Sequence, residues 1–327
     1  MDVRLPEARR RDPAEVGPGL LVSPEPGGLS AIPEPLPSAA IARVRPAAGV
    51  LARWQARLAR LIESHPARVG LGMVLFWAAV AVLAPWLAPY PPNATDYAVL
   101  ARPTPSASHW LGTDHLGRDI LSRIIWGART VLVVAPVTVI GATILGSILG
   151  LTAGYYRGWA DLVLARACDI VLSFPVIILY MIILARFGSS AWNIIFVLTL
   201  TRAPIIFRIV RGLTLELRER EYVAAAKMRG ESALYIMVWE ILPNARGPLM
   251  VDMCLRMGYN TIIIGVLGFL GIGLPPPDPD WGGMVKDTYG MMSVWPHMAL
   301  FPCAAISSLV VGFNLLAIGL REIGLRD

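Results

Sequence analysis

A segment rich in charged and small residues, EYVAAAKMRGESALYIMVWEILPN at 221–244, lies between two strongly apolar segments. Its first part favours a short helix, Gly230 can take the left-handed conformation that ends a helix, and Ser232 can cap a second helix that Pro243 would end. Small side chains let a partner's groove approach a helix backbone, while flanking charges set the register. We therefore predict a docking hairpin rather than a catalytic site. Its candidate contact residues are Glu221, Ala224, Ala225, Ala226, Lys227, Gly230, Glu240 and Pro243.

Patterns for catalysis or metal binding are absent from the sequence. No GxxxxGK[ST] loop occurs, so the chain cannot cradle ATP phosphates in that way, and neither a nucleophile elbow nor an HExxH pair is found. The cysteines and histidines are scattered, without the spacing of a zinc site or a disulfide framework. We expect a chain without enzyme activity, metal site or cofactor of its own, whose energy must come from another polypeptide.

The notable charged residues within the apolar runs are Arg202, Asp252 and Arg256. Such groups are costly in a bilayer and usually face a bundle interior or a wet cavity. Asp252 and Arg256 have the i, i+4 spacing of a helical ion pair, which is more often structural than substrate-contacting. Arg202 is the better candidate for a translocation pathway, although snorkelling of its long side chain would equally explain it. We take all three as candidate pathway residues.

The composition is that of a polytopic membrane protein, with 55% apolar residues, 16% charged residues and a mean hydropathy of +0.59. The net charge of +6 comes without the basic and aromatic stripe of a nucleic-acid reader. Arginines before the first apolar run and after the fourth predict that both regions are cytoplasmic, and an even number of spans then places both termini there. Six segments are long enough to cross a bilayer. They are 69–88, 131–153, 168–187, 191–210, 248–272 and 298–320.

These spans divide the chain into five predicted parts. The Pro-rich start has too little apolar periodicity to fold alone, and the next segment has arginines beside or opposite one apolar face, as in a helix on an anionic membrane surface. The alternative for this second segment is a plain extension of the first span. The parts are a disordered cytoplasmic tail at 1–49, an interfacial helix at 50–68, a first span with an extracytoplasmic loop at 69–130, a five-helix core at 131–320 with a cytoplasmic hairpin at 213–245, and a cytoplasmic end at 321–327.

Four glycines recur near four-residue spacing in the second predicted span, at Gly141, Gly146, Gly150 and Gly154. Residues at this spacing share one helix face, and small residues there let a neighbouring helix approach closely. Close packing is the default prediction, and a gate hinge is the sharper alternative.

The hairpin resembles a known motif. Ala224-Ala-Ala226, three residues, Gly230, nine residues and Glu240-Ile-Leu-Pro243 are similar in spacing to the EAA motif of ABC-importer permeases. In that family the motif forms coupling helices that insert into a cleft of the ATPase subunit. The resemblance therefore implies the same docking role for this hairpin.

Further stretches resemble the C-type permease subunit of the dipeptide/oligopeptide/nickel group. They follow one another in order over roughly residues 70–322, which makes convergence improbable. They are LGTDHLGRDILSR at 111–123, GLTAGYYRGWAD at 150–161, FP at 174–175, RIVRG at 208–212, FLGIG at 269–273, WG at 281–282 and FNLL at 313–316.

The sequence departs from the family pattern at four positions. Ala224 stands where the motif has its first Glu, and Glu240 replaces a common His. Ile264 and Ile318 stand where inner spans of the family carry carboxylates. The first pair changes the polar contacts of docking, and the second pair implies a different substrate or compensation by a partner subunit.

The resemblance implies an all-α integral membrane protein with six transmembrane helices and the type I ABC-importer permease fold, in a bacterial inner membrane. The chain would pair with a B-type permease, contact two ATPase subunits that bind ATP and Mg, and receive substrate from an extracytoplasmic binding protein. Short peptides are the implied substrate class, with nickel or another small polar solute left open. A rival class, the ion-gradient-driven secondary transporter, predicts discontinuous helices and midplane carboxylates. Few buried carboxylates and no obvious inverted repeat disfavour it.

Overall fold

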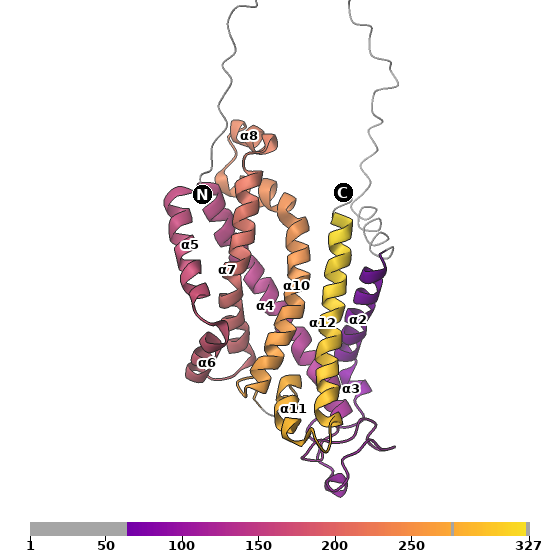
Figure 1. Ribbon diagram of the computed structural model, residues 1–327. Helices are drawn as coiled ribbons and strands as arrows, with labels where there is room; N and C mark the ends of the chain where they lie inside the picture. The colour runs from indigo at the N-terminus through magenta and orange to yellow at the C-terminus, as the bar shows by residue number, and fades with distance from the viewer. Residues whose placement is uncertain (1–63, 276–277, 325–327) are drawn as a thin grey trace, which may run out of the picture. The chain divides into compact units, whose positions relative to one another are not determined.

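The computed structural model describes residues 64–275 and 278–324. The predicted tail at 1–49 and most of the predicted interfacial helix, 50–63, lie outside these residues, and everything below refers to the unit that follows residue 49. The described residues form helices and loops without a strand, apart from two isolated bridges. The helices, labelled in Figure 1, are α2 (His65–Val82), α3 (Ala84–Leu87), α4 (Ile120–Tyr156), α5 (Gly158–Ser173), α6 (Val176–Phe187), α7 (Ala191–Leu217), α8 (Glu221–Met228), α9 (Ala233–Tyr235), α10 (Leu242–Phe269), α11 (Trp281–Thr288) and α12 (His297–Gly324). Short turns of 3-10 helix are Tyr97–Val99 and Tyr289–Met291, and a π-helical segment is Ile236–Ile241.

Five of these helical stretches are long and apolar enough to cross a membrane, and the bent pair α5–α6 makes a sixth if it counts as one span. The prediction of one continuous span at 168–187 is wrong, because α5 and α6 meet at an angle of 86°. The break lies at Phe174 and Pro175, whose backbones are extended or non-helical. A proline disfavours the helical conformation of the residue before it, so the two helices cannot join here.

The second span begins at Ile120 rather than at 131, so part of the predicted outer loop is helical. Asp119 caps this helix by accepting a hydrogen bond of 2.7 Å from the backbone nitrogen of Ser122. Arg123, which the prediction placed in the outer loop, is buried and donates to the backbone oxygen of Pro92 at 3.3 Å. Burial with a partner lets a charged residue stand in the first turns of a long helix.

Pro243 does not end a helix, contrary to the prediction. It lies in the first turn of α10, where a missing backbone N–H costs nothing. The predicted hairpin at 213–245 also overlaps α7, which continues to Leu217. Only the residues from 218 to 241 therefore stand between the two long helices.

The predicted close packing of the glycine face is confirmed. A Cβ atom on Gly146 would lie 2.7 Å from the Cβ of Ile206, and one on Gly154 would lie 2.6 Å from the Cβ of Thr214. Gly150 meets Val210 in the same way. Because the contacted residue number rises along both helices, α4 and α7 run in the same direction and end together beside α8 (Figure 1).

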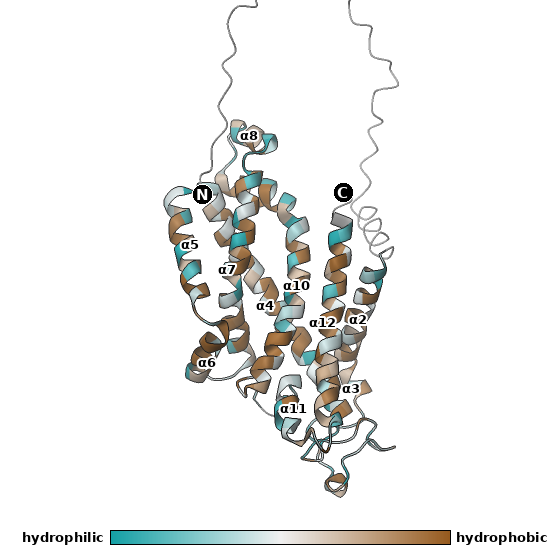
Figure 2. Cartoon of the chain, viewed as in Figure 1, coloured by the Kyte–Doolittle hydropathy of each residue, from teal (hydrophilic) through white to brown (hydrophobic). Residues whose placement is uncertain are grey.

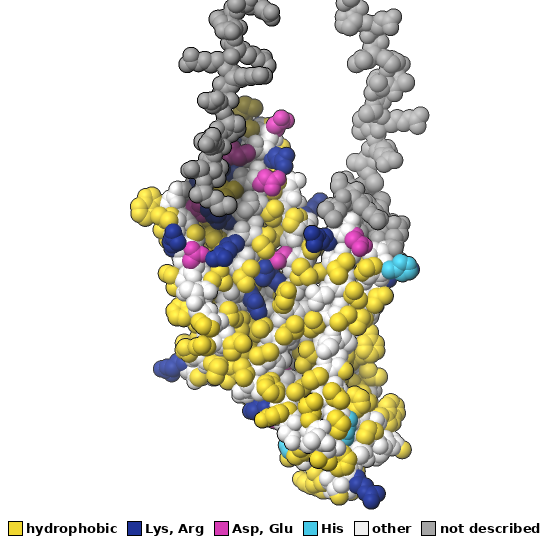
Figure 3. Space-filling model, viewed as in Figure 1, with side chains coloured by type: hydrophobic (Ala, Val, Ile, Leu, Met, Phe, Trp, Pro, Cys, Tyr) yellow, Lys and Arg dark blue, Asp and Glu magenta, His cyan; other side chains and the backbone are white. Residues whose placement is uncertain are grey.

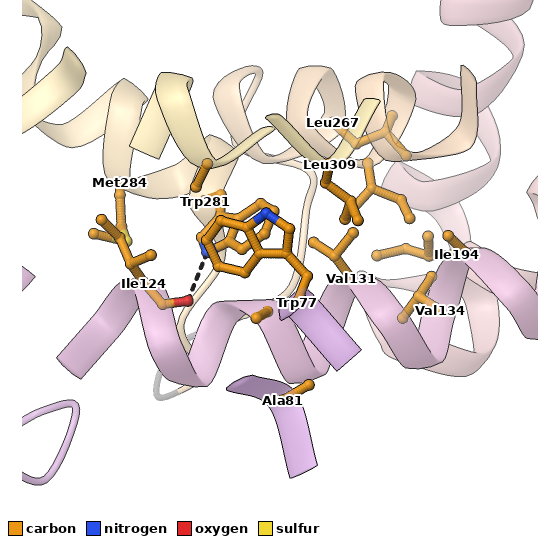
Figure 4. Packing of buried hydrophobic residues seen from close by; sticks show 14 of the residues in the cluster. Trp77, Ala81, Ile124, Val131, Val134, Ile194, Leu267, Trp281, Met284 and Leu309 are labelled. Carbon is orange, nitrogen blue, oxygen red and sulfur yellow. Dashed lines mark hydrogen bonds between the residues drawn. The ribbon is translucent and has the colours of Figure 1, made fainter. Parts of the chain in front are cut away.

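The apolar core at the other end of the described bundle is built around two tryptophans (Figure 4). Trp281 is fully buried and donates a hydrogen bond of 2.9 Å from Nε1 to the backbone oxygen of Ile124, and its ring meets that of Trp77 edge to face at 5.0 Å. Gly127 leaves space for the indole, since a Cβ there would lie 2.5 Å from Trp281 Cδ1. These contacts fix α11 against the first turns of α4.

Polarity follows the long axis of the helices. Apolar residues dominate their middle parts (Figure 2), and on the face shown in Figure 3 charged side chains gather toward α8. The outer surface of the helices carries many exposed large apolar residues, among them Trp86, Trp159, Phe187 and Trp192. A lipid-facing surface accounts for this distribution.

Candidate functional site

The hairpin predicted for docking begins with α8 and a tight turn. Arg229 is the C-terminal cap of α8, and Gly230 follows it with a φ of 79°, as expected for a left-handed residue. The N–H of Gly230 donates to Lys227 at 3.0 Å, and the N–H of Glu231 donates to Ala226 at 3.2 Å. These two bonds are those of a Schellman motif, which closes the helix and reverses the chain. Ser232 then caps the next turn by accepting from the backbone nitrogen of Tyr235 at 3.2 Å.

Only part of α8 faces outward. Val223 and Ala226 are fully buried against Ile236 and Ile241, so Ala226 cannot contact a partner directly. Among the other predicted contact residues, the exposed ones are Glu221, Ala224, Lys227 and Gly230, and the half-buried ones are Ala225, Glu240 and Pro243. The open face of α8 is therefore a charged and small-residue surface with Ala224 at its centre.

The second arm of the hairpin adds an apolar surface that the sequence analysis did not single out. Leu234 and Trp239 are each 68% exposed, and with Tyr235 and Val238 they line a shallow hollow of about 280 Å³. Their positions in the sequence, two adjacent pairs four residues apart, are the signal that could have identified one helical face. Glu240 is less available, because Arg229 Nη2 lies 3.2 Å from its Oε1.

The hairpin is fastened to the end of α4. The Tyr155 ring lies between two cations, with Lys227 Nζ 5.7 Å and Arg218 Cζ 6.0 Å from its centroid. Arg218 also donates to the backbone oxygens of Tyr155 and, at 3.5 Å, of Gly154. A cation near the last carbonyls of a helix interacts favourably with its dipole. These contacts join α8 and the end of α7 to the end of α4.

Ion pairs join α5 to α7 in the same region. Arg211 donates to both carboxylate oxygens of Asp161, the second bond at 2.6 Å, and Arg208 lies 2.8 Å from Asp169. The two-bond geometry of Arg211 and Asp161 gives orientation as well as attraction. Asp161, Arg208 and Arg211 belong to the stretches that carry the family resemblance.

The three predicted pathway residues are not brought together. Asp252 and Arg256 pair with each other along α10, with Arg256 Nη2 2.9 Å from Asp252 Oδ1, and Arg256 is only 9% exposed. Arg202 lies half-buried on α7, and within the described residues its Nε is buried without a hydrogen-bond partner. Of the two positions that lack a family carboxylate, Ile264 is buried in the apolar core and Ile318 is 47% exposed.

The LGTDHLGRDILSR stretch forms a buried polar network before α4. The Oδ1 of Asp114 accepts from the backbone nitrogens of Leu116 and Arg118, and its Oδ2 accepts from Arg118 Nε at 2.6 Å. His109 Nδ1 lies 2.9 Å from the Oδ1 of Asp119. This network holds the loop across the start of α4, which explains why the motif needs two aspartates.

Comparison with known proteins agrees with the geometry. Residues 146–323 match the family model described as binding-protein-dependent transport system inner membrane component, and residues 52–104 match the N-terminal TM domain of oligopeptide transport permease C. The chain is 38% identical over 270 residues to a glutathione transport system permease protein of Pectobacterium atrosepticum, covering 82% of this chain and 89% of that protein. It is 38% identical over 274 residues to a dipeptide transport system permease protein of Alkalihalophilus pseudofirmus, covering 82% and 88%.

These matches confirm the predicted all-α fold of a type I ABC permease and the predicted multi-pass membrane protein. A chain of this kind is a transporter subunit that works within an importer. The chain belongs to the binding-protein-dependent transport system inner membrane component family, as a C-type permease subunit of the dipeptide and oligopeptide kind.

Proposed function

We propose that this permease forms half of the translocation pathway of an importer for short peptides and receives ATP-driven motion through residues 221–243. The observation that carries the proposal is the hairpin itself. It presents an exposed face around Ala224 and the hollow at Leu234 and Trp239, and it is fastened through Tyr155 to a helix that spans the whole bundle. A small-residue face beside an apolar hollow suits insertion into the cleft of a partner protein.

The partners follow from this role. A B-type permease supplies the other half of the pathway, two ATPase subunits bind ATP and Mg and meet the hairpins, and an extracytoplasmic binding protein delivers substrate. The α8 end and both termini are then cytoplasmic, and the α11 end faces outward, in the inner membrane of a bacterium.

The mechanism is a rigid-body switch. Closure of the ATPase dimer pushes on α8, and the contacts of Tyr155 pass the displacement to α4. Because α4 and α7 interlock through Gly146, Gly150 and Gly154, the two helices move as one body rather than sliding past each other. The pathway between the two permeases then opens to the opposite side of the membrane, and its opening is coupled to ATP binding at a distant site.

The substrate class rests on relatives whose printed names are dipeptide and glutathione transport. Short peptides are therefore the first candidates, with nickel or another small polar solute as the alternative within the same importer type. Within the membrane, Arg202 is the stronger pathway candidate, because its Nε is buried without a partner among the described residues. Asp252 and Arg256 already neutralise each other, which favours a structural role.

The test uses the complete complex in proteoliposomes, with its ATPases inside and its binding protein outside. ATP hydrolysis and peptide uptake are measured for Ala224→Arg and Trp239→Ala. Both substitutions alter exposed side chains, so the chain should insert normally while stimulated hydrolysis and uptake fall at least tenfold.

The matched control is Trp159→Ala, which removes a tryptophan of α5, outside the hairpin, that is 80% exposed. We expect it to leave both rates within about twofold of the unmodified complex, as for a lipid-facing residue. Full activity of the two hairpin variants would disprove the docking role.

A further inference from the structure

A polar pocket of about 280 Å³ lies at the α11 end of the described bundle, apart from the hairpin and from the three intramembrane charges. The start of α4, the end of α10 and α11 enclose it, and the start of α4 lies far from the other two in the sequence (Figure 1). Its walls carry charges of both signs. The charged residues are Arg118, Arg123, Lys286, Asp278, Asp280 and Asp287.

Glycines after α10 make room for two of these charges. A Cβ on Gly273 would lie 2.7 Å from Asp280 Oδ2, and one on Gly268 would lie only 1.9 Å from the same oxygen. A Cβ on Gly271 would lie 2.4 Å from Lys286 Nζ. Larger residues in this loop would displace the carboxylate and the ammonium, so the FLGIG stretch shapes the charged wall of the pocket.

Several of the charged lining residues already form ion pairs with other side chains of the protein. Arg118 Nε lies 2.6 Å from Asp114, and its Nη2 lies 3.7 Å from Asp287. Arg123 Nε lies 3.8 Å from Asp114 as well. These residues form the network that closes the loop before α4, and they leave little charge free for a ligand.

Asp280 and Lys286 differ from the network residues. Among the described residues, the carboxylate of Asp280 accepts from the backbone nitrogens of Gly282 and Gly283, each at 3.2 Å, and from no side chain, which leaves acceptor positions free. Lys286 makes no ion pair within the part of the chain that the structure describes. Asp278 is a second lining carboxylate without an ion pair there, but it is exposed, whereas Asp280 is buried. The pocket therefore offers one buried carboxylate and one ammonium that have no side-chain partner among the described residues.

Keeping the buried carboxylate of Asp280 ionised also costs free energy. Asp280 is 5% exposed, and burial raises its pKa to about 6 despite the two backbone hydrogen bonds and the charge of Arg123. A cation placed against it would offset the desolvation. The side chain is thus suited to receive an ammonium group.

The pocket favours a short ligand. Lys286 Nζ lies beside Gly271 and Asp280 Oδ2 lies beside Gly273, so both charged groups lie along the same short stretch of backbone. A pocket of about 280 Å³ is also at the small end of ligand sites, which start near 300 Å³.

We propose that this pocket is a binding subsite for a free zwitterionic dipeptide, with the peptide ammonium at Asp280 and the peptide carboxylate at Lys286. The assignment rests on the proposed function and adds to it a contact made by the permease itself at its outer mouth. A loop of a binding protein fits less well, because an internal loop carries neither a terminal ammonium nor a terminal carboxylate.

The experiment measures equilibrium binding of radiolabelled dialanine to the complete importer in nanodiscs, with the binding protein omitted. We expect saturable binding that weakens about tenfold in Lys286→Gln, as for the loss of one charged hydrogen bond. The matched control is Arg186→Gln, which removes one exposed positive charge near the same end, three residues before the pocket residue Ser189, and should bind dialanine normally.

Blocked peptides assign each end. Dialanine amide, which lacks the carboxylate, should bind the unmodified complex about tenfold more weakly than dialanine and lose nothing further in Lys286→Gln. N-acetyl-dialanine, which lacks the ammonium, should also bind the unmodified complex about tenfold more weakly than dialanine and lose nothing further in Asp280→Asn. Since Asp280 also caps α11, the Lys286 arm keeps the test decisive if Asp280→Asn fails to fold.

Three results would overturn the assignment. The first is the absence of saturable dialanine binding, and the second is equal dialanine binding by Lys286→Gln and the unmodified complex. The third is that Lys286→Gln weakens only the affinity for the binding protein and leaves dialanine binding unchanged. Uptake by the same complex with its binding protein is measured in parallel. Normal peptide uptake without pocket binding disproves the subsite and leaves the proposed function intact, whereas absent uptake of any peptide counts against the proposed function itself.

Discussion

Arg218, near the end of α7, donates a hydrogen bond to the backbone oxygen of Tyr155 in the last turn of α4. The same tyrosine ring lies 5.7 Å from Lys227 of α8. One aromatic residue of α4 therefore contacts both the residue that caps α7 and the hairpin. This contact joins α8 to α4 in addition to the buried packing of Val223 and Ala226.

We predict that Tyr155→Ala uncouples transport from ATP hydrolysis. Two cation–π contacts at a partly exposed site are together worth about 1 kcal/mol, so peptide uptake per ATP hydrolysed should fall about fivefold. Uptake and hydrolysis are measured together in proteoliposomes. Tyr155→Phe keeps the ring and should behave normally, and equal coupling in the Ala and Phe variants would remove Tyr155 from the mechanism.

The interlocked faces of α4 and α7 predict a loss of stability in Gly150→Ala. The new Cβ would lie 2.8 Å from the Cβ of Val210, and overpacking of this kind costs about 1–3 kcal/mol. The unfolding temperature in detergent should drop by several degrees. Gly72→Ala is the matched control, because nothing lies within 4 Å of the added methyl on α2, and it should be neutral or stabilising. A Gly150→Ala protein as stable as Gly72→Ala would contradict the packing.

The ion pair of Asp252 and Arg256 on α10 predicts that a double variant regains the stability and uptake that a single variant loses. Asp252→Asn leaves the guanidinium of Arg256, which is 9% exposed, without its carboxylate, and breaking a buried pair costs about 3–5 kcal/mol. Adding Arg256→Gln removes the unpaired charge, so we expect most of the stability and uptake to return. Thermal unfolding and peptide uptake are the measurements. Stability that returns without uptake would instead assign the pair to the pathway.

Asp280 predicts a pH dependence of stability. Its pKa of about 6 in the folded chain lies above the ordinary 3.8, so the folded state binds more protons between these two values. The contribution of this group is therefore fully present below pH 4 and is lost as the pH rises through about 6. We expect the unfolding temperature of the unmodified chain, relative to that of Asp280→Asn, to be higher at pH 5 than at pH 7.5.

The control for this measurement is Asp278→Asn, which removes an exposed carboxylate from the same loop. Its difference from the unmodified chain should stay constant over the same range. A constant difference for Asp280→Asn as well would show that Asp280 does not titrate there.

The helical elements were largely predictable from the sequence, because hydropathy and helix signals depend on neighbouring residues. The positions of the spans and the turn at Gly230 follow from such local patterns. The glycine face of α4 could be predicted for the same reason, since residues four apart share one side of a helix. The break at Pro175 was also present as a local signal, but the apolar composition around it was taken to indicate one continuous span.

The errors arose where distant residues decide the outcome. The outer loop was predicted to extend to residue 130, yet Arg123 lies buried in α4, where it contacts Asp114 and the backbone of Pro92. A hydropathy pattern cannot contain this information, because the cost of burying a charge depends on partners that only the folded chain supplies.

The hairpin shows most clearly which features depend on local sequence and which depend on tertiary packing. Local chemistry determines that the chain turns at Gly230 and Ser232, because positive φ and side-chain capping are properties of single residues. Packing against Ile236 decides that Ala226 is buried while Ala224 stays open to a partner. The sequence by itself thus determined that this membrane chain carries a hairpin between two long helices. The tertiary structure alone decided which side of it is exposed, since that depends on which apolar surfaces meet when the helices pack.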